Sequence, residues 1–402
     1  MFMPMRWLYW IIWQVLYPGA YKLVGVLINL LPRTHPWHIW QTARKNLVRE
    51  DITTDPSVLF FCPSLGEYQA ITSLIHEHRV NSPQLGIEVV FFSLSGYQNL
   101  PRMAHDVDSI TLSPLDLKTD CTAYFDRRNV RHVIISTLAI WPAFLSYLDD
   151  HDIPFTFVNV DYKKGFWHRI YYTSLSPLLS QALNIYCLNQ KVVSEWQSML
   201  SSDNVVIGGD GRLEMIDRQL TGISGDKTPK KSKIIFASIE PSEWPMLELL
   251  TPLLEQEHQI TIAPHDIVHA TGIVQKIKSL YPDHLEKIDV VDRMGLLISL
   301  YPEHDIAYVG GGFDKGIHNI AEPILAGCRV ITGPNYASDP YAALLKEEEG
   351  ISIARSLQEI IECIMHLVNH PRSADSTSIQ NYLRSNKGSA SDIYEDLKEL
   401  YQ

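Results

Sequence analysis

Short apolar runs alternate with amphipathic segments over most of the chain, beginning near residue 58. Apolar runs bounded by turn residues are typical of buried strands. Because helical spacing follows most of them, the pattern predicts parallel, doubly wound sheets. We expect strands at 58–61, 86–93, 109–112, 132–136, 155–160, 183–188 and 205–207, and a second set at 233–237, 259–263, 287–290, 306–309 and 329–332.

The alternation is interrupted by the polar segment 221–233, which contains two glycines and a proline and indicates a domain boundary. A length of 402 residues also favours two domains. The predicted class is α/β, with two Rossmann-like halves facing a cleft. We expect an N-terminal segment at 1–50, domains at 51–220 and 234–402, and final helices at 357–370 and 391–401 that cap or cross the second domain.

The first fifty residues differ from the rest. Five of the nine tryptophans lie there, with six basic residues and no acidic residue before Glu50, and Lys22 is the one charge within 7–31. Basic flanks and tryptophans suit an anionic membrane surface, so the segment predicts a membrane-inserted or interfacial anchor. A soluble helical hairpin is the main alternative, and a cleaved signal peptide is disfavoured because no small-residue cleavage site follows.

Composition narrows the function classes. A net charge of -12 argues against a general nucleic-acid binder. The five cysteines form no C-x-x-C pair, which indicates neither a metal knuckle nor a disulfide scaffold. A reducing cytosolic compartment fits this cysteine usage best. Together with the basic N-terminal segment, it suggests a cytosolic enzyme that works at a membrane.

The most informative stretch is 309–334, where an apolar run leads into a helical segment through three consecutive glycines, Gly310, Gly311 and Gly312. Glycines let a backbone approach an anion, and a helix N-terminus offers free N–H groups. The stretch predicts a phosphate site, although the glycines could serve only as turn residues. Asn319 and Glu322 share one helical face, where the carboxylate could hold ribose hydroxyls.

Loops after other strands supply further candidates, because ligands of such sheets sit beyond the carboxyl ends of the strands. Glu67 could be a general base for a sugar hydroxyl, or an ordinary first-turn glutamate. His265, after Pro264, could donate to a phosphate or be a polar loop residue. Arg212 could reach an anion or merely cap the sheet. The remaining candidates follow two other strands: Ser238, Met294, Gly295 and Leu296.

The sixteen histidines give little indication of a metal site. His76 and His78 are two apart, which places them on different helix faces. His265 and His269 are four apart, but a loop intervenes. We therefore expect no metal and no cofactor, and the sequence also lacks a G-x-S-x-G motif and a Walker loop.

The order of these motifs resembles the 3-deoxy-D-manno-octulosonic acid (Kdo) transferases of lipopolysaccharide synthesis. The resemblance rests on S-L-G-E at 64–67, G-D-G-R-L-E at 209–214, M-G-L at 294–296, and G-G-F, G-I-H-N and E-P at 311–313, 316–319 and 322–323. It implies a two-domain GT-B glycosyltransferase at the cytoplasmic side of the inner membrane. It further implies inverting, metal-independent transfer of Kdo from CMP-Kdo to a lipid A precursor.

The resemblance implies Glu67 as catalytic base, phosphate on Gly311 and Gly312, and Glu322 on the ribose, with Met294 and Gly295 beside the base. Three positions depart from the family pattern: His265 replaces an arginine, and Ala139 and Gly295 replace glutamates. Arg212 and Lys315 could compensate for the missing charge. Otherwise the donor or acceptor differs, or the protein is a weakly active or non-catalytic, membrane-surface relative.

Overall fold

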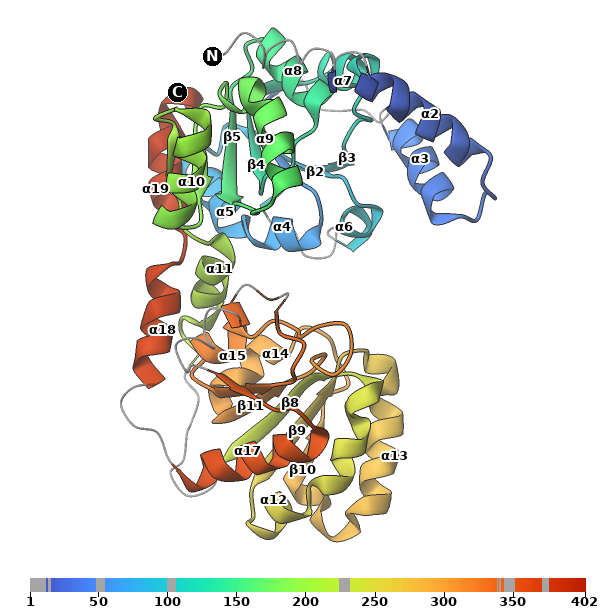
Figure 1. The fold of residues 1–402 in the computed structure, drawn as a ribbon, viewed down its shortest axis with the longest axis vertical. Helices are drawn as coiled ribbons and strands as arrows, with labels where there is room; N and C mark the ends of the chain where they lie inside the picture. The colour runs from blue at the N-terminus through green and yellow to red at the C-terminus, as the bar shows by residue number, and fades with distance from the viewer. Residues whose placement is uncertain are drawn as a thin grey trace. The chain divides into compact units, whose positions relative to one another are not determined.

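The computed structural model describes residues 12–13, 16–47, 55–99, 106–223, 232–337, 339, 341–342, 351–370 and 376–402. The chain divides into two compact units, the first formed by 1–215 and 386–402 and the second by 216–385 (Figure 1). The division at 215–216 precedes the predicted linker, 221–233. Most of the predicted linker, 224–231, lies outside the described residues.

The first unit is built on a parallel seven-stranded sheet with the order β3-β2-β1-β4-β5-β6-β7. Six of the seven residues of β1 are buried, as expected for a strand covered on both faces. All seven strands were predicted, and β3, β5 and β7 have the predicted ends. The strands are β1 Pro56–Cys62, β2 Gly86–Phe91, β3 Ser109–Leu112, β4 Asn129–Ser136, β5 Phe155–Val160, β6 Ile185–Cys187 and β7 Val205–Ile207.

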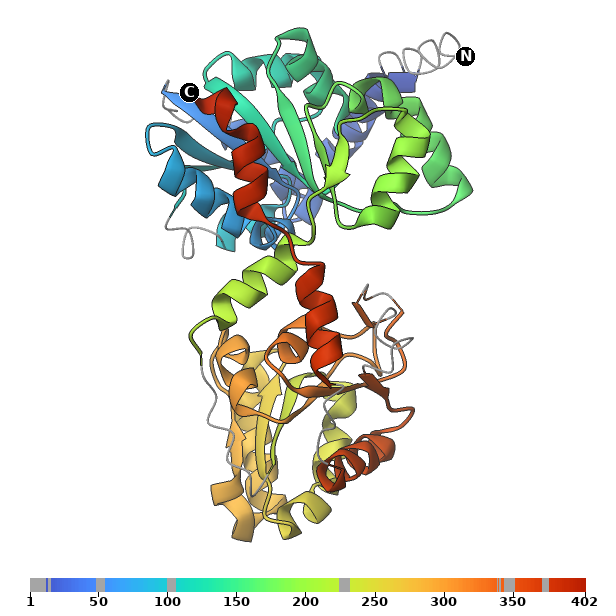
Figure 2. The same cartoon turned by 90° about the vertical axis from the view of Figure 1, so that its left-hand side faces the viewer.

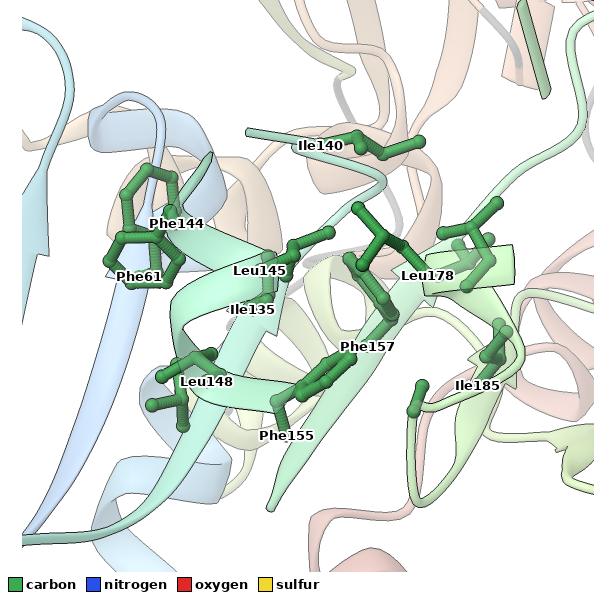
Figure 3. Packing of buried hydrophobic residues seen from close by; sticks show 14 of the residues in the cluster. Phe61, Ile135, Ile140, Phe144, Leu145, Leu148, Phe155, Phe157, Leu178 and Ile185 are labelled. Carbon is green, nitrogen blue, oxygen red and sulfur yellow. The ribbon is translucent and has the colours of Figure 1, made fainter. Parts of the chain in front are cut away.

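Apolar side chains fill both faces of this sheet. On one face, phenylalanines of β1 and β5 pack with leucines and a phenylalanine of α8 (Figure 3). Each such buried side chain contributes about 1.5–3 kcal/mol to stability. The helices that follow the strands are α4 Leu65–Gln69, α5 Thr72–Asn81, α6 Leu94–Asn99, α7 Lys118–Phe125, α8 Pro142–Asp150, α9 Phe166–Leu179, α10 Gln190–Leu200 and α11 Gly211–Leu220.

The N-terminal segment forms two helices that pack on each other, α2 Tyr17–Asn29 and α3 Pro36–Leu47. Arg44 of α3 is buried: its guanidinium lies over the rings of Trp40 and Phe92 and donates to the Phe92 carbonyl at 2.6 Å. Helix α3 is therefore part of the first unit. Within the described ranges, none of the helices has the length and hydropathy of a membrane span.

The C-terminal helix contradicts the expected domain assignment. Helix α19, Ala390–Leu397, packs against α5 of the first unit rather than capping the second (Figure 2). Tyr401, in the turn η7 Lys398–Tyr401, accepts from His132 Nδ1 at 2.8 Å and donates to His78 Nε2 at 2.9 Å. The reason is chemical, because these two buried imidazoles need a partner that the phenol supplies.

The second unit carries a parallel six-stranded sheet with the order β10-β9-β8-β11-β12-β13. Five strands were predicted, and β13 was not. The strands are β8 Lys233–Ile239, β9 Gln259–Pro264, β10 Ile288–Val290, β11 Ile306–Val309, β12 Arg329–Thr332 and β13 Ile351–Ile353. The α-helices are α12 Thr251–Glu255, α13 Ala270–Leu280, α14 Leu297–Leu300, α15 Ala321–Leu325, α17 Leu357–Asn369 and α18 Ser376–Ser385.

Several helical segments between these strands are short or adopt the 3-10 form. The segment 244–256 is the 3-10 helix η3 Pro241–Leu249 followed by α12, and Pro245 inside η3 cannot donate an α-helical hydrogen bond. Three further 3-10 turns link the elements: η4 Ile267–His269, η5 Pro282–Lys287 and η6 Tyr301–Glu303.

Candidate functional site

Glu67 lies in the first turn of α4, directly after β1. Its carboxylate accepts a hydrogen bond from the Ser64 hydroxyl through Oε2. Its other oxygen, Oε1, lies 3.9 Å from Arg212 Nη2. The Glu67 side chain is 22% exposed, so the carboxylate is held in place and still reaches solvent. Such an oriented, accessible carboxylate can take a proton from a hydroxyl.

Arg212 reaches Glu67 because the chain turns sharply before α11. The Gly211 amide donates to Asn159 Oδ1 at 2.9 Å, and Asn159 Nδ2 donates to the Ala70 carbonyl at 3.1 Å. A Cβ on Gly211 would lie 2.0 Å from the Ala70 carbonyl oxygen, so only glycine fits. The structure thus brings together Glu67 and Arg212, two predicted residues far apart in the sequence.

A mainly apolar pocket of about 450 Å³ opens beside the turn between β1 and α4. Pro63, just before Ser64, forms one wall, and Ala139 another. Trp13 and Tyr17 contribute from the N-terminal segment, and Tyr171 from α9. The pocket has the size and lining to hold an apolar group of a small molecule.

Buried Asp116 lies behind this region. Its Oδ1 accepts from the Phe144 amide at 2.9 Å. Burial raises the pKa of Asp116 to about 6, while the Phe144 amide and the Tyr17 hydroxyl oppose the rise. Burial and the nearby Asp116 charge also raise the pKa of Tyr17, which keeps its phenol protonated. Tyr17 of α2 and Asp116 are therefore close enough to shift each other's pKa.

In the second unit, the predicted residues Ser238, Pro264 and His265 lie at neighbouring strand ends. Ser238 has a φ of 53°, a left-handed conformation that a non-glycine residue seldom adopts, and the β8–β9 register shifts beside it. Its carbonyl oxygen would lie 2.4 Å from a Cβ on Gly310. The strained turn therefore packs tightly on the glycine loop, as strained backbone often does at functional sites.

The glycine loop differs from the predicted phosphate cradle. The Gly311 amide donates to Glu243 Oε1 at 2.9 Å, so it is engaged by a carboxylate. Gly312 packs against Gly333, where a Cβ would lie 2.5 Å from the Gly333 Cα. Helix α15 behind the loop has five residues, so the expected helix N-terminus is a single turn. Phosphate binding at Gly311 and Gly312 stays a prediction.

Glu243 organises this edge of the sheet, and sequence reasoning missed it. Its Oε1 also accepts from the Tyr308 hydroxyl at 2.8 Å, and its Oε2 accepts from the Glu240 amide at 2.9 Å. Burial and the Glu243 charge raise the pKa of Tyr308, so the phenol stays a donor. The signal was a glutamate three residues after Glu240, the spacing of a helix capping box.

Next to the hydrogen bonds of Glu243, the side chains of Glu240, His265 and His318 form a cluster. Glu240 Oε1 lies 3.2 Å from His318 Nε2 and 3.9 Å from His265 Nε2. The two rings stack with centroids 4.1 Å apart. Burial and then His265 lower the pKa of His318, although Glu240 opposes the shift, which favours the neutral imidazole.

The other predicted residues make few contacts with the residues described above. Asn319 Nδ2 donates to Glu322 Oε1 at 2.9 Å, and burial raises the pKa of Glu322 despite this bond. Lys315 is exposed on the glycine loop. Over the described ranges, no hydrogen bond or ion pair links Met294, Gly295 or Leu296 to the other candidates. Their role beside a base stays a prediction.

Comparison with known proteins agrees with these motifs. Residues 39–215 match the family model described as 3-deoxy-D-manno-octulosonic-acid transferase (kdotransferase). The 3-deoxy-D-manno-octulosonic acid transferase of Haemophilus influenzae is 23% identical over 369 residues, 85% of this chain and 86% of that protein. The transferase of Aquifex aeolicus is 24% identical over 306 residues, 72% of this chain and 80% of its own length. The chain is similar to Kdo transferases along most of its length.

Comparison with a solved structure supports the fold. UDP-GlcNAc 2-epimerase from Neisseria meningitidis has a TM-score of 0.58 at 12% identity, covering 85% of this chain and 98% of the epimerase chain. This likeness shows the fold alone. The predicted class, two parallel-sheet α/β domains of the GT-B kind, is confirmed, and the relatives support glycosyltransferase activity.

Proposed function

We propose that the chain transfers Kdo from CMP-Kdo to a lipid A precursor at the cytoplasmic face of the inner membrane. The observation that carries the proposal is the Glu67 site, in a chain related to Kdo transferases along most of its length. The donor nucleotide would use the strand ends of the second unit. Glu322 would hold the ribose, and Lys315 would supply positive charge.

Glu67 would act as general base. The Ser64 hydrogen bond fixes Oε2, and Arg212 faces Oε1. The acceptor hydroxyl would give its proton to this carboxylate and attack the anomeric carbon, while the C–O bond to CMP breaks with inversion. General-base assistance of this kind contributes about 10²–10⁴-fold to rate. No proton or electron passes through a metal ion in this transfer.

Two features of the first unit support a lipid acceptor at a membrane surface. Phe166 and Trp167 on α9 are 71% and 77% exposed, and Leu27 on α2 is 53% exposed. Large apolar side chains at such exposure are typical of a surface that meets lipid. The pocket behind Tyr171 and Ala139 would receive an apolar part of the acceptor.

The alternative function is transfer of another sugar, or to another acceptor. It is favoured by the departures at the site: His265 in place of an arginine, and Ala139 in the wall of the pocket. A non-catalytic relative is a further possibility, for which Glu67, Asn319 and Glu322 would have no use.

Ligand-dependent thermal unfolding with CMP, UDP and GDP separates these functions. We expect CMP to raise the melting temperature most, in wild-type protein and in Glu67→Gln alike, since Glu67 touches the acceptor and not the nucleotide. A larger shift with UDP or GDP would replace the donor in the proposal. CMP binding without transfer to any lipid acceptor would favour the non-catalytic relative.

A further inference from the structure

Three side chains converge at the carboxyl edge of the second sheet. Glu240 directly follows β8, His265 directly follows β9, and His318 lies in the glycine loop after β11. Strand β8 lies between β9 and β11, so the three side chains come from adjacent parallel strands. This edge is where ligands of doubly wound sheets bind, which makes the cluster a product of the fold rather than a chance surface encounter.

The ligand-type atoms of the cluster are already close. One atom from each of Glu240, His265 and His318 lies within 4.8 Å of the other two. Two imidazole nitrogens and one carboxylate oxygen are a donor set that Zn²⁺ and related first-row divalent ions accept. The His318 ring fits because Gly311 has no side chain, since a Cβ there would lie 3.1 Å from the ring.

The backbone holds each residue in place. The His265 amide donates to the Ile239 carbonyl at 3.1 Å, and the His318 amide donates to the Gly310 carbonyl at 3.1 Å. The Glu240 side chain accepts from the Glu243 amide in the capping box. These bonds fix the main chain at both histidines, and the capping box also orients the Glu240 carboxylate.

Charge gives the strongest reason for a cation here. The glycine loop, where a nucleotide phosphate is expected, is bordered by the carboxyl groups of Glu240 and Glu243. The Gly311 amide already donates its hydrogen bond to Glu243. A phosphate at this edge would meet negative charge at close range, and a divalent ion between the carboxylate and the phosphate would reverse that repulsion.

We propose that Glu240, His265 and His318 bind one Zn²⁺-like divalent cation, which leaves a coordination position open for an oxygen of the nucleotide phosphate. The phosphate part rests on the proposed function, and the cation site does not. Binding requires the stacked rings to tilt apart so that their nitrogens converge. His265 is 51% exposed and can make this rotation.

Co²⁺ titration of metal-stripped, full-length protein tests the site, because tetrahedral Co²⁺ with nitrogen ligands has a characteristic visible spectrum. We expect one Co²⁺ per chain, displaced by Zn²⁺. His265→Ala, His318→Ala and Glu240→Gln should each weaken binding by more than about 100-fold, because removing a ligand costs more than removing an outer hydrogen bond.

A matched control is present on α17, where His366 and His370 also stack, with ring centroids 4.3 Å apart. His366→Ala should bind Co²⁺ as the wild type does. No binding by wild-type protein, unchanged binding by His265→Ala, or loss of binding in His366→Ala would each overturn the site.

Coupling to the nucleotide is measured separately. CMP affinity should rise at least about tenfold when Zn²⁺ is added, and His318→Ala should remove this increase. If the metal binds at the three residues and CMP does not bind with or without it, the proposed donor fails and the cation site stands. If CMP binds equally well with and without the metal, the inferred link to phosphate is overturned.

Discussion

The carboxyl edges of the two sheets use their acidic side chains differently. In the first unit, Glu67 faces a cation, Arg212, and a hydroxyl donor, Ser64. In the second unit, Glu243 is buried among amide and phenol donors, and Glu240 faces two imidazoles. The first arrangement suits a carboxylate that receives a proton. In the second arrangement no lysine or arginine pairs with Glu240 or Glu243 among the contacts described, which suits a site that receives a cation.

The histidines of the two units also differ, in their burial and in their hydrogen-bond partners. His78 and His132 of the first unit are buried and bound through Tyr401, whereas His265 and His318 are partly exposed at the sheet edge. Buried, fully partnered histidines stabilise a core. Partly exposed histidines next to a carboxylate remain available to a ligand.

The largest expected effect is the loss of transfer in Glu67→Gln. The amide keeps the shape of the side chain but cannot accept the proton, so the rate should fall about 10³-fold while CMP affinity stays unchanged. Product formation measured by mass spectrometry checks this. Glu195→Gln, which changes a partly exposed glutamate paired with Lys164, is the control and should keep full activity. Transfer at the wild-type rate in Glu67→Gln would remove the contrast between the units.

Glu243→Ala should destabilise the protein by about 3 kcal/mol. The substitution leaves the Gly311 amide, the Tyr308 hydroxyl and the Glu240 amide without their acceptor. Tyr308→Phe removes one of these bonds and should cost about 1 kcal/mol. Urea unfolding measures both, and a loss below that of Tyr308→Phe would show that Glu243 does not organise the sheet edge.

Acid should destabilise the first unit through its buried histidines. Burial lowers the pKa of His78 to about 4 and of His132 to about 3, from the ordinary 6.5. The unfolded chain therefore binds more protons below pH 6.5, and stability falls with pH from there towards pH 4 and below. The loss at pH 5 should be about 2 kcal/mol per histidine. Unfolding at pH 7 and 5 should show a smaller loss for His132→Gln than for the control His366→Gln, and equal losses would contradict this.

Arg212→Met has the smallest expected effect. The guanidinium lies 3.9 Å from Glu67 Oε1 and is 44% exposed, so solvent screens the pair. We expect about a fivefold loss of transfer rate, since exposed ion pairs contribute at most about 1 kcal/mol. A loss as large as that of Glu67→Gln, measured in the same assay, would show that Arg212 contacts substrate charge.

The sequence predicted the strands of both sheets because buried parallel strands are continuous apolar runs, and β13 escaped because its three residues are only partly buried. The position of α19 could not be predicted, since an apolar helix face does not say which sheet it covers. His265 was a candidate and His318 lay within the G-I-H-N motif, but their contact depends on strand order. The Gly311 amide was expected to bind phosphate because nothing in the local pattern revealed Glu243 as its acceptor.

Mass analysis of wild-type protein incubated with freshly made CMP-Kdo and a lipid A precursor tests the proposed Kdo transfer. We predict a lipid product heavier by one or more Kdo residues, formed together with CMP. An unmodified lipid, from protein that is folded and saturated with CMP-Kdo, would contradict it.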